Sequence, residues 1–237
     1  MNSRETVTAD KYIEALKDIS RAINSDLYLE DILKLIVMVT AKVTGVEICS
    51  LWLIEEDGKK TYLRLKATQT IEPAYVKDRV LNINEGVVGR VASAKQPLII
   101  KDVLSEPQFK EKEMARSLGL KSLASVPLLL RDERIIGVLN CFTSEPHDFT
   151  DTEVNLITTV ANQAAVAIFN SELIVKTRVI QEELETRKMV ERAKEALMNR
   201  GNIDADEAYR RIQKKSMDSR KSMRSIAEAI LLSEELY

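Results

Sequence analysis

The side chains with the clearest chemistry lie between residues 187 and 224, where twelve Lys and Arg residues stand against six Asp and Glu residues. The whole chain of 237 residues carries a formal net charge of only -2, so this excess is local. Clustered cations bind phosphates, because neutralising a phosphate releases the counterions condensed on a nucleic acid. The segment therefore indicates nucleic-acid binding, although a solvated helix face rich in Lys and Arg would give the same charge balance.

Three helical patterns must position these cations. The first, over residues 189–200, predicts a helix that closes with a left-handed cap at Gly201. The second begins at Asp204, whose carboxylate can cap the first turn while Glu207 reaches back, and the third covers residues 223–231. Each is too short to be stable alone in water. We therefore expect the three to bury their apolar stripes against one another as a small three-helix bundle.

The order and spacing of individual residues in this segment follow a known pattern. They are Arg192, Ala193, Lys194, Leu197, Met198, Arg200, Asp206, Glu207, Ala208, Tyr209, Ile212, Ser216, Met217, Arg220, Ile226 and Ala227. This pattern resembles the ANTAR domain, an RNA-binding antiterminator module of bacteria. Glu195 stands where that family usually has Gly, and Ile212 where Leu is common. The resemblance implies binding to paired hairpin loops in a leader RNA, so that an overlapping terminator hairpin does not form.

Seven cations and one ring are the expected RNA contacts: Lys194, Arg200, Arg210, Lys214, Arg220, Lys221, Arg224 and Tyr209. The cations would contact phosphates or base edges, and Tyr209 could stack on an unpaired loop base. A tyrosine at this helical position could equally be a core residue with its hydroxyl at the rim. Two hairpin loops in one RNA would suit two copies of the bundle, so a homodimer is predicted.

Residues 172–186 contain neither Gly nor Pro and keep an imperfect heptad-like stripe of Leu173, Ile180 and Leu184. They predict a helical linker that pairs as a coiled coil, with a single solvated connector helix as the alternative. We expect residues 1–171 to form a sensory or dimerising domain and residues 187–237 to form the RNA-binding helical domain.

The first domain mixes helical and strand periodicity. Helices are expected over residues 9–24 and, capped by Ser25 or Asp26, up to Gly45. The elements expected after them are a hairpin over 46–65, a strand over 79–83, a short helix at 85–92, an edge strand at 97–100, strands over 122–130 and 135–142, and a helix opened by a Thr150–Glu153 capping box. Antiparallel strands flanked by helices predict an α+β domain.

Several short motifs follow one another across residues 10–171: Asn84 to Gly89, Pro97 with Leu98, Asp102, Ser125 to Leu128, and Ile136 to Leu139. In this order they resemble a GAF domain. The resemblance implies a sensory or dimerising module with a pocket between the sheet and the segment around residues 68–120. No cofactor is identifiable, and the signal is left open as a small molecule or a protein.

Catalytic and metal-binding machinery is not visible in the sequence. Cys49 and Cys141 fall in apolar strand patterns and are expected to be reduced core thiols. His147, the only histidine, is expected in a solvent-facing turn. Without a nucleophile-base set or a phosphate-cradling loop, the chain is predicted not to be an enzyme.

The N-terminus has no basic start followed by an apolar block, and no apolar run approaches about 20 residues. We therefore expect a cytoplasmic protein that does not contact a membrane. The sequence favours a transcription antitermination regulator with a GAF-like sensor and an RNA-binding bundle. Two alternatives remain: a DNA-binding transcription regulator, and a non-enzymatic dimeric protein-interaction signalling module.

Overall fold

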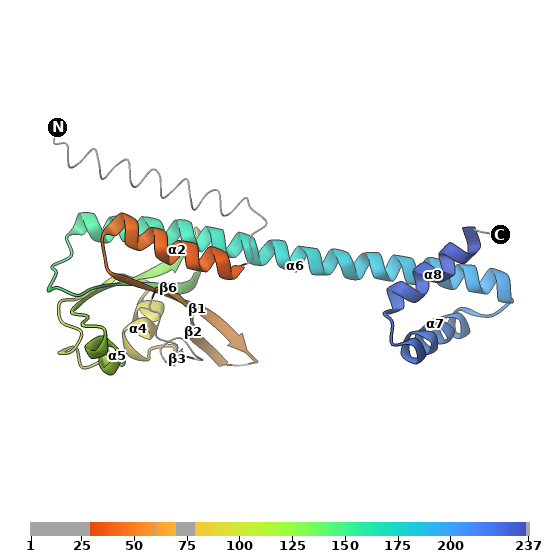
Figure 1. Ribbon diagram of the computed structural model, residues 1–237, viewed down its shortest axis with the longest axis horizontal. Helices are drawn as coiled ribbons and strands as arrows, with labels where there is room; N and C mark the ends of the chain where they lie inside the picture. Colours follow the sequence, from red (N-terminus) through yellow and green to blue (C-terminus); the bar gives the residue numbers. More distant parts are fainter. Residues whose placement is uncertain (1–28, 59, 70–78, 236–237) are drawn as a thin grey trace, which may run out of the picture. The chain divides into compact units, whose positions relative to one another are not determined.

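The computed structural model describes residues 29–58, 60–69 and 79–235 (Figure 1). The chain divides into two compact units, Met1–Glu172 and Leu173–Tyr237. The helix expected over residues 9–24 and the cap expected at Ser25 or Asp26 lie outside the described residues.

The first unit is built on a six-stranded antiparallel sheet with the strand order β3-β2-β1-β6-β5-β4. In chain order the strands are β1 (Ile48–Asp57), β2 (Lys60–Thr68), β3 (Val80–Asn82), β4 (Leu98–Ile100), β5 (Ser122–Leu129) and β6 (Ile135–Thr143). Helix α2 (Leu29–Thr44) and the first part of α6 (Asp151–Gly201) cover one face, and α4 (Gly86–Ala94) and α5 (Lys112–Ser117) lie on the other (Figure 1). The predicted α+β fold is confirmed.

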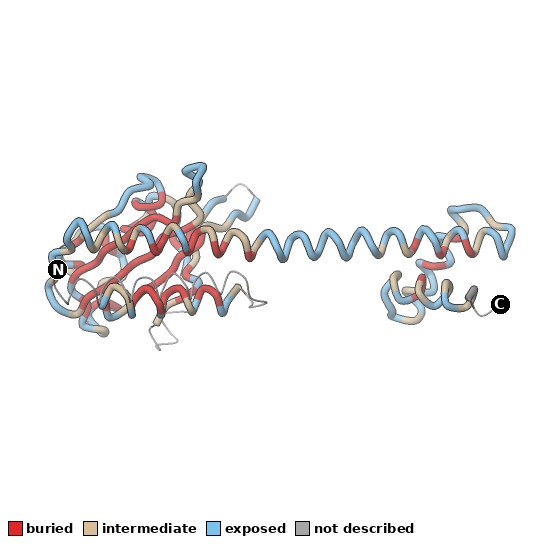
Figure 2. The backbone as a smooth tube through the Cα atoms, turned by 90° about the horizontal axis from the view of Figure 1, so that it is seen from above, coloured by how far each residue is buried: buried red, intermediate tan, exposed pale blue. Residues whose placement is uncertain are grey.

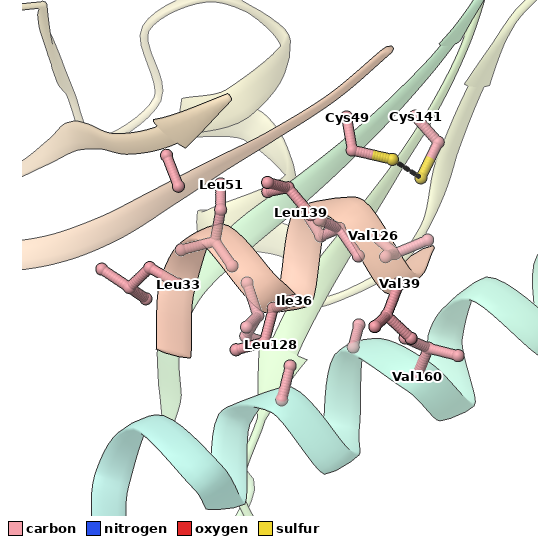
Figure 3. Close-up of a cluster of buried hydrophobic side chains, with 14 of the residues drawn as sticks. Leu33, Ile36, Val39, Cys49, Leu51, Val126, Leu128, Leu139, Cys141 and Val160 are labelled. Atoms are coloured by element: carbon pink, nitrogen blue, oxygen red, sulfur yellow. Dashed lines mark hydrogen bonds between the residues drawn. The ribbon is translucent and has the colours of Figure 1, made fainter. Parts of the chain in front are cut away.

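Strand β1 shows why the centre of the sheet is apolar throughout. Cys49, Leu51 and Leu53 belong to the core cluster beneath α2 and α6, whereas Trp52 belongs to the cluster that includes α4 and α5. Successive side chains of a strand point to opposite faces, so a strand covered on both faces needs apolar residues at nearly every position. Figure 3 shows the first cluster, with Val39 of α2 and Val160 of α6 facing the strands.

Gly137 of β6 permits a close approach between the two central strands. A Cβ atom at this position would lie 2.1 Å from the carbonyl oxygen of Trp52, a distance that no side chain allows. The neighbouring register of β1 shifts between Leu51 and Trp52, which marks a bulge. A glycine inside a strand pattern predicts a bulge or a close approach, and the structure has the close approach at Gly137.

The Asn84–Gly89 motif forms the entrance to α4. The Glu85 carboxylate accepts hydrogen bonds from the backbone N–H and the side-chain amide of Asn82, at 3.0 and 2.9 Å. A Cβ atom on Gly89 would come within 2.6 Å of the Asn82 carbonyl oxygen. The motif therefore ties β3 to the first turn of α4 and needs a glycine to do so.

Helix α6 begins with the predicted capping box. The backbone N–H and hydroxyl of Thr150 donate to Glu153 at 2.7 and 2.9 Å, and the Glu153 N–H donates to the Thr150 hydroxyl at 3.3 Å. The helix then continues without a break to Gly201, so the linker residues 172–186 are helical; their pairing as a coiled coil stays a prediction. Helix α5 was not predicted, because its six residues are too few to show a helical period.

The second unit packs the last turns of α6 against α7 (Ala205–Ser219) and α8 (Met223–Glu235). Its small core consists of Val190, Ala193, Ile212, Ile226 and Ala227, all at most 7% exposed. The predicted three-helix bundle is confirmed.

Two details at the α6–α7 turn differ from the prediction. The left-handed residue is Asn202, with φ 46°, and not Gly201. Asparagine is the next most tolerant residue in this conformation, because its short side chain can hydrogen-bond locally. Asp204 does cap α7, accepting from the Glu207 N–H at 2.7 Å. The Glu207 carboxylate pairs instead with Nε of Arg211, at 3.0 Å.

Candidate nucleic-acid interface

Helix α7 exposes Arg210 and Lys214, between Asp206 and Asp218, because its apolar residues are used on the other side. Ala208 and Ile212 are fully buried in the bundle, whereas Arg210 and Lys214 are exposed. Nε of Arg210 donates to the carbonyl oxygen of Asp206 at 3.3 Å, one turn back on the same helix. Arg210 and Lys214 are one turn apart, so they lie on the same side of the helix and can contact neighbouring phosphates.

The corner between α7 and α8 holds Arg220 and Lys221 on a defined backbone. Arg220 adopts φ 54°, and its N–H closes α7 on the Met217 carbonyl oxygen at 3.2 Å. The Lys221 N–H donates to the carbonyl oxygen of Ser216 at 3.2 Å, and the Ser216 hydroxyl donates back to the carbonyl oxygen of Lys221 at 2.6 Å. Both cationic side chains are exposed on a corner that the backbone already orders.

Helix α8 starts directly after this corner. The Ser222 hydroxyl accepts from the Ser225 N–H at 3.1 Å and so caps the first turn. Only residues 220–222 separate α7 from α8. We group the exposed cations of α7 and of the corner as the cationic surface, defined as Arg210, Lys214, Arg220 and Lys221.

A groove of about 680 Å³ lies within the second unit, between α6 and the start of α8. Its lining residues are Val179, Glu182, Glu183, Thr186, Arg187, Val190, Glu191, Tyr209, Ser222, Met223 and Arg224. The structure thus brings Tyr209 and Arg224, two of the predicted contacts, into one groove. The Tyr209 side chain is 41% exposed, so this ring is not a fully buried core residue.

Arg224 is already paired with carboxylates. Its Nε lies 3.0 Å from Oε1 of Glu228 and its Nη1 lies 3.8 Å from Oε2 of Glu185. The hydrogen bond to Glu228, together with the negative charge of Glu185, raises the pKa of the Arg224 guanidinium above its ordinary value. An RNA phosphate would have to compete with both carboxylates, so Arg224 is placed to brace α8 against α6.

Lys194 is similarly engaged. Its ammonium lies 2.9 Å from Oε2 of Glu191, and its side chain is only 17% exposed. Arg200 is exposed near the end of α6. Arg187 also lines the groove, although it was not among the predicted contacts. The sequence showed it only as one of the twelve local cations, because its position in the groove depends on how α6 packs against α8.

In the first unit, part of the segment around residues 68–120 packs as core. Val87, Val91, Phe109 and Met114 are buried together against Trp52 of the sheet. Residues 70–78 of this segment lie outside the described residues. No group of three or more metal-ligating side chains occurs within the described ranges.

His147 is less exposed than a free turn residue. Its Nε2 lies 3.0 Å from Oε1 of Glu153, its ring packs edge-on against Phe149, and its side chain is 39% exposed. Partial burial opposes ionisation of Glu153, but the hydrogen bonds from Thr150 and the nearby His147 outweigh it and lower the pKa of the carboxyl. The solvent-facing position predicted for His147 is therefore only partly correct, since the ring helps to hold the start of α6.

Comparison with protein families divides the chain in the same way. The GAF domain family matches residues 28–168, which is more than half of the chain, and the ANTAR domain family matches residues 178–231. No helix in the described part of the chain is long and apolar enough to cross a membrane.

Individual relatives match one part of the chain or the other. The phosphoenolpyruvate-dependent phosphotransferase system protein of Escherichia coli is 25% identical over 158 residues, covering 67% of this chain and 21% of that protein. The transcriptional regulatory protein PdtaR of Mycobacterium tuberculosis is 42% identical over 52 residues, covering 22% of this chain and 25% of PdtaR. The alignments with these two relatives thus span a quarter of their lengths or less.

The fold of the first unit also has solved neighbours. The GAF domain of a phosphoenolpyruvate-protein phosphotransferase from Coxiella burnetii superposes with a TM-score of 0.61 at 24% identity, over 71% of this chain and 98% of that one. The solved neighbour and the GAF family match cover the first unit, and the ANTAR family match covers the second. The chain belongs to the GAF domain family and carries an ANTAR domain after the GAF domain.

Proposed function

We propose that this protein is a transcription antitermination regulator whose ANTAR unit binds paired hairpin loops in a leader RNA under the control of its GAF unit. The observation that carries the proposal is the cationic surface of α7 and the α7–α8 corner, where exposed cations stand on an ordered backbone. The transcriptional role that its name gives to PdtaR, a relative of the ANTAR unit, supports the same conclusion.

The cationic surface supplies the electrostatic part of binding. Hairpin loops expose phosphates and unstacked bases, which cations and aromatic rings recognise. Arg210, Lys214, Arg220 and Lys221 would contact loop phosphates, with Arg200 and Lys194 towards the end of α6. Tyr209, which lines the groove, would stack on one splayed base.

The glutamates that line the groove repel phosphates but accept hydrogen bonds from base N–H groups. Glu182, Glu183 and Glu191 share the groove with Tyr209. The groove is thus better suited to a base than to the sugar-phosphate backbone. Arg224, held by Glu185 and Glu228, would act on RNA binding chiefly by keeping α8 in place.

Dimerisation would use the exposed stretch of α6. Every residue from 173 to 185 is exposed (Figure 2), and Leu173, Ile180 and Leu184 are between 44% and 64% exposed. These residues follow a heptad-like stripe, and burying such side chains is worth about 1.5–3 kcal/mol each. A second copy of the same helix would cover them and would bring two RNA-binding units to one transcript.

The functional test is a binding titration of the purified full-length protein against three nucleic acids of equal length. These are a two-hairpin RNA, the same RNA with scrambled loop sequences, and a duplex DNA. We expect tight binding to the intact loops alone. Equal weak binding to all three would contradict the proposal. The binding would then reflect only non-specific charge attraction, and the protein-interaction module would become the favoured function.

A DNA-binding role is the second candidate, and one observation favours it. The three-residue connection between α7 and α8 has the length of the turn in a helix-turn-helix. Helix α8, however, uses Ile226 and Ala227 for the bundle core and pairs Arg224 with Glu228. Preferential binding of the duplex DNA in the same titration would establish this candidate instead.

We further place the protein in the cytoplasm and assign it no catalytic activity. Both matched families are regulatory domains. Some proteins with the GAF fold are enzymes, such as the free methionine-R-sulfoxide reductase of Neisseria meningitidis, which is 21% identical to this chain. That likeness shows the fold alone.

A further inference from the structure

The two cysteines of the chain lie directly opposite each other on the central strands of the GAF sheet. Cys49 of β1 pairs in register with Cys141 of β6, and their sulfur atoms are 3.6 Å apart (Figure 3). Both side chains are fully buried and both thiols are free. They are separated by 92 positions in the sequence, so the fold alone brings them together.

This arrangement needs little change to become a disulfide. Opposed residues of an antiparallel pair have Cα atoms roughly 4.5–5.5 Å apart, within the range of about 4.4–6.8 Å that disulfides span. The sulfur atoms already touch and would need to approach only to about 2.05 Å. We propose that Cys49 and Cys141 form an oxidisable dithiol, a modification site that peroxide converts into a cross-strand disulfide.

The chemistry balances with one peroxide per pair. The thiolate of one cysteine attacks a peroxide oxygen, the O–O bond breaks, and a sulfenic acid and water form. The thiolate of the second cysteine then attacks the sulfenic sulfur, the S–O bond breaks, and the S–S bond forms with release of a second water. The dithiol loses two electrons and two protons, and the peroxide is reduced to two waters.

Burial decides the rate of this reaction. Removal from water raises the pKa of the Cys49 thiol, so little thiolate exists in the closed fold. Cys49 is the second residue of β1 and Cys141 is the third from last of β6. Opening of these strand ends would expose the pair without unfolding the sheet. Oxidation is therefore gated by local opening, and the second thiol traps the sulfenic acid before it oxidises further.

The test exposes the reduced full-length protein to hydrogen peroxide, labels the remaining thiols with N-ethylmaleimide in denaturant, and measures the intact mass. The expected product has lost two hydrogens, takes no label, and regains two labels after dithiothreitol. Peptide mapping of the same wild-type sample should link the Cys49 and Cys141 peptides. Two fully labelled cysteines after prolonged oxidation, or oxygen gained on the Cys49 or Cys141 peptide rather than on methionines, would overturn the proposal.

A matched variant checks the trapping step. Cys141→Ser keeps the size of the side chain but removes the second thiol, so Cys49 should gain oxygen and show no loss of two hydrogens. Loss of two hydrogens in this variant would contradict the assignment. The wild-type peptide map gives the answer independently if Cys141→Ser does not fold.

Discussion

Replacing Arg220 with glycine separates the charge of this residue from its conformation. Arg220 ends α7 with φ 54°, a left-handed conformation that costs a non-glycine residue roughly 1–2 kcal/mol. Arg220→Gly removes that cost. The greater conformational freedom of glycine in the unfolded chain, however, destabilises the folded state by about 0.5–1 kcal/mol. The net effect on the free energy of unfolding is between zero and about 1.5 kcal/mol of stabilisation. The variant should therefore fold at least as well as the wild type.

RNA binding should change in the opposite direction. Loss of one phosphate contact makes the negative slope of log K against log salt concentration shallower by about one. The variant should therefore bind roughly tenfold more weakly than the wild type at 0.1 M salt and almost equally at 1 M. Fluorescence anisotropy with the two-hairpin RNA across a salt series measures the slope. Thermal unfolding monitored by circular dichroism measures the stability of the same samples.

The GAF unit supplies a matched control for this variant. Lys95 ends α4 with φ 55°, so Lys95→Gly also removes a cation from a left-handed helix cap. It should leave the RNA affinity and the salt slope unchanged. Wild-type affinity and slope for Arg220→Gly would refute the assignment of the α7–α8 corner to RNA, as would an equal loss in Lys95→Gly.

Three further predictions address other parts of the molecule. Lys214→Glu, which reverses an exposed charge on α7, should weaken RNA binding more than tenfold at 0.1 M salt with an unchanged circular dichroism spectrum, whereas wild-type affinity would remove Lys214 from the interface. Ile180→Lys in α6 should shift the protein from dimer to monomer in analytical ultracentrifugation, and the exposed Met217→Lys in α7 should not. Partial burial opposes ionisation of Glu55, but hydrogen bonds from Lys66 and Arg64 outweigh it and lower its pKa from 4.5 to about 2. The stability that Glu55 provides is thus complete above pH 4.5 and is lost as the pH falls towards 2. In urea titrations, the wild type should have a higher free energy of unfolding than Glu55→Gln above pH 4.5, and this difference should disappear as the pH falls towards 2. A difference that stays constant over this pH range would contradict the role of Glu55.

Local signals predicted most elements of the fold. The Thr150–Glu153 box, the Asp204 cap and the period change after Gly45 each act within a few residues of the chain, and the structure contains all three. A glycine inside a strand pattern predicts a bulge or a close approach, and Gly137 permits the close approach. Family resemblance added the order of the two domains.

Contacts between distant segments could not be predicted in the same way. The pairing of Cys49 with Cys141 depends on the register of two strands far apart in sequence. The ion pair between Arg224 and Glu185 depends on how α8 packs on α6, and it changes the role expected of Arg224. At the end of α6, Gly201 and Asn202 are both tolerant of left-handed geometry, so the sequence alone did not distinguish them.

Chemical probing of the two-hairpin RNA, with and without the full-length protein, shows whether the ANTAR unit binds both loops. We expect the loop nucleotides of both hairpins to become protected together, at the same protein concentration, while the stems keep their reactivity. Protection of the stems alone, or of neither hairpin at concentrations that saturate the RNA, would contradict the claim that the ANTAR unit reads paired loops.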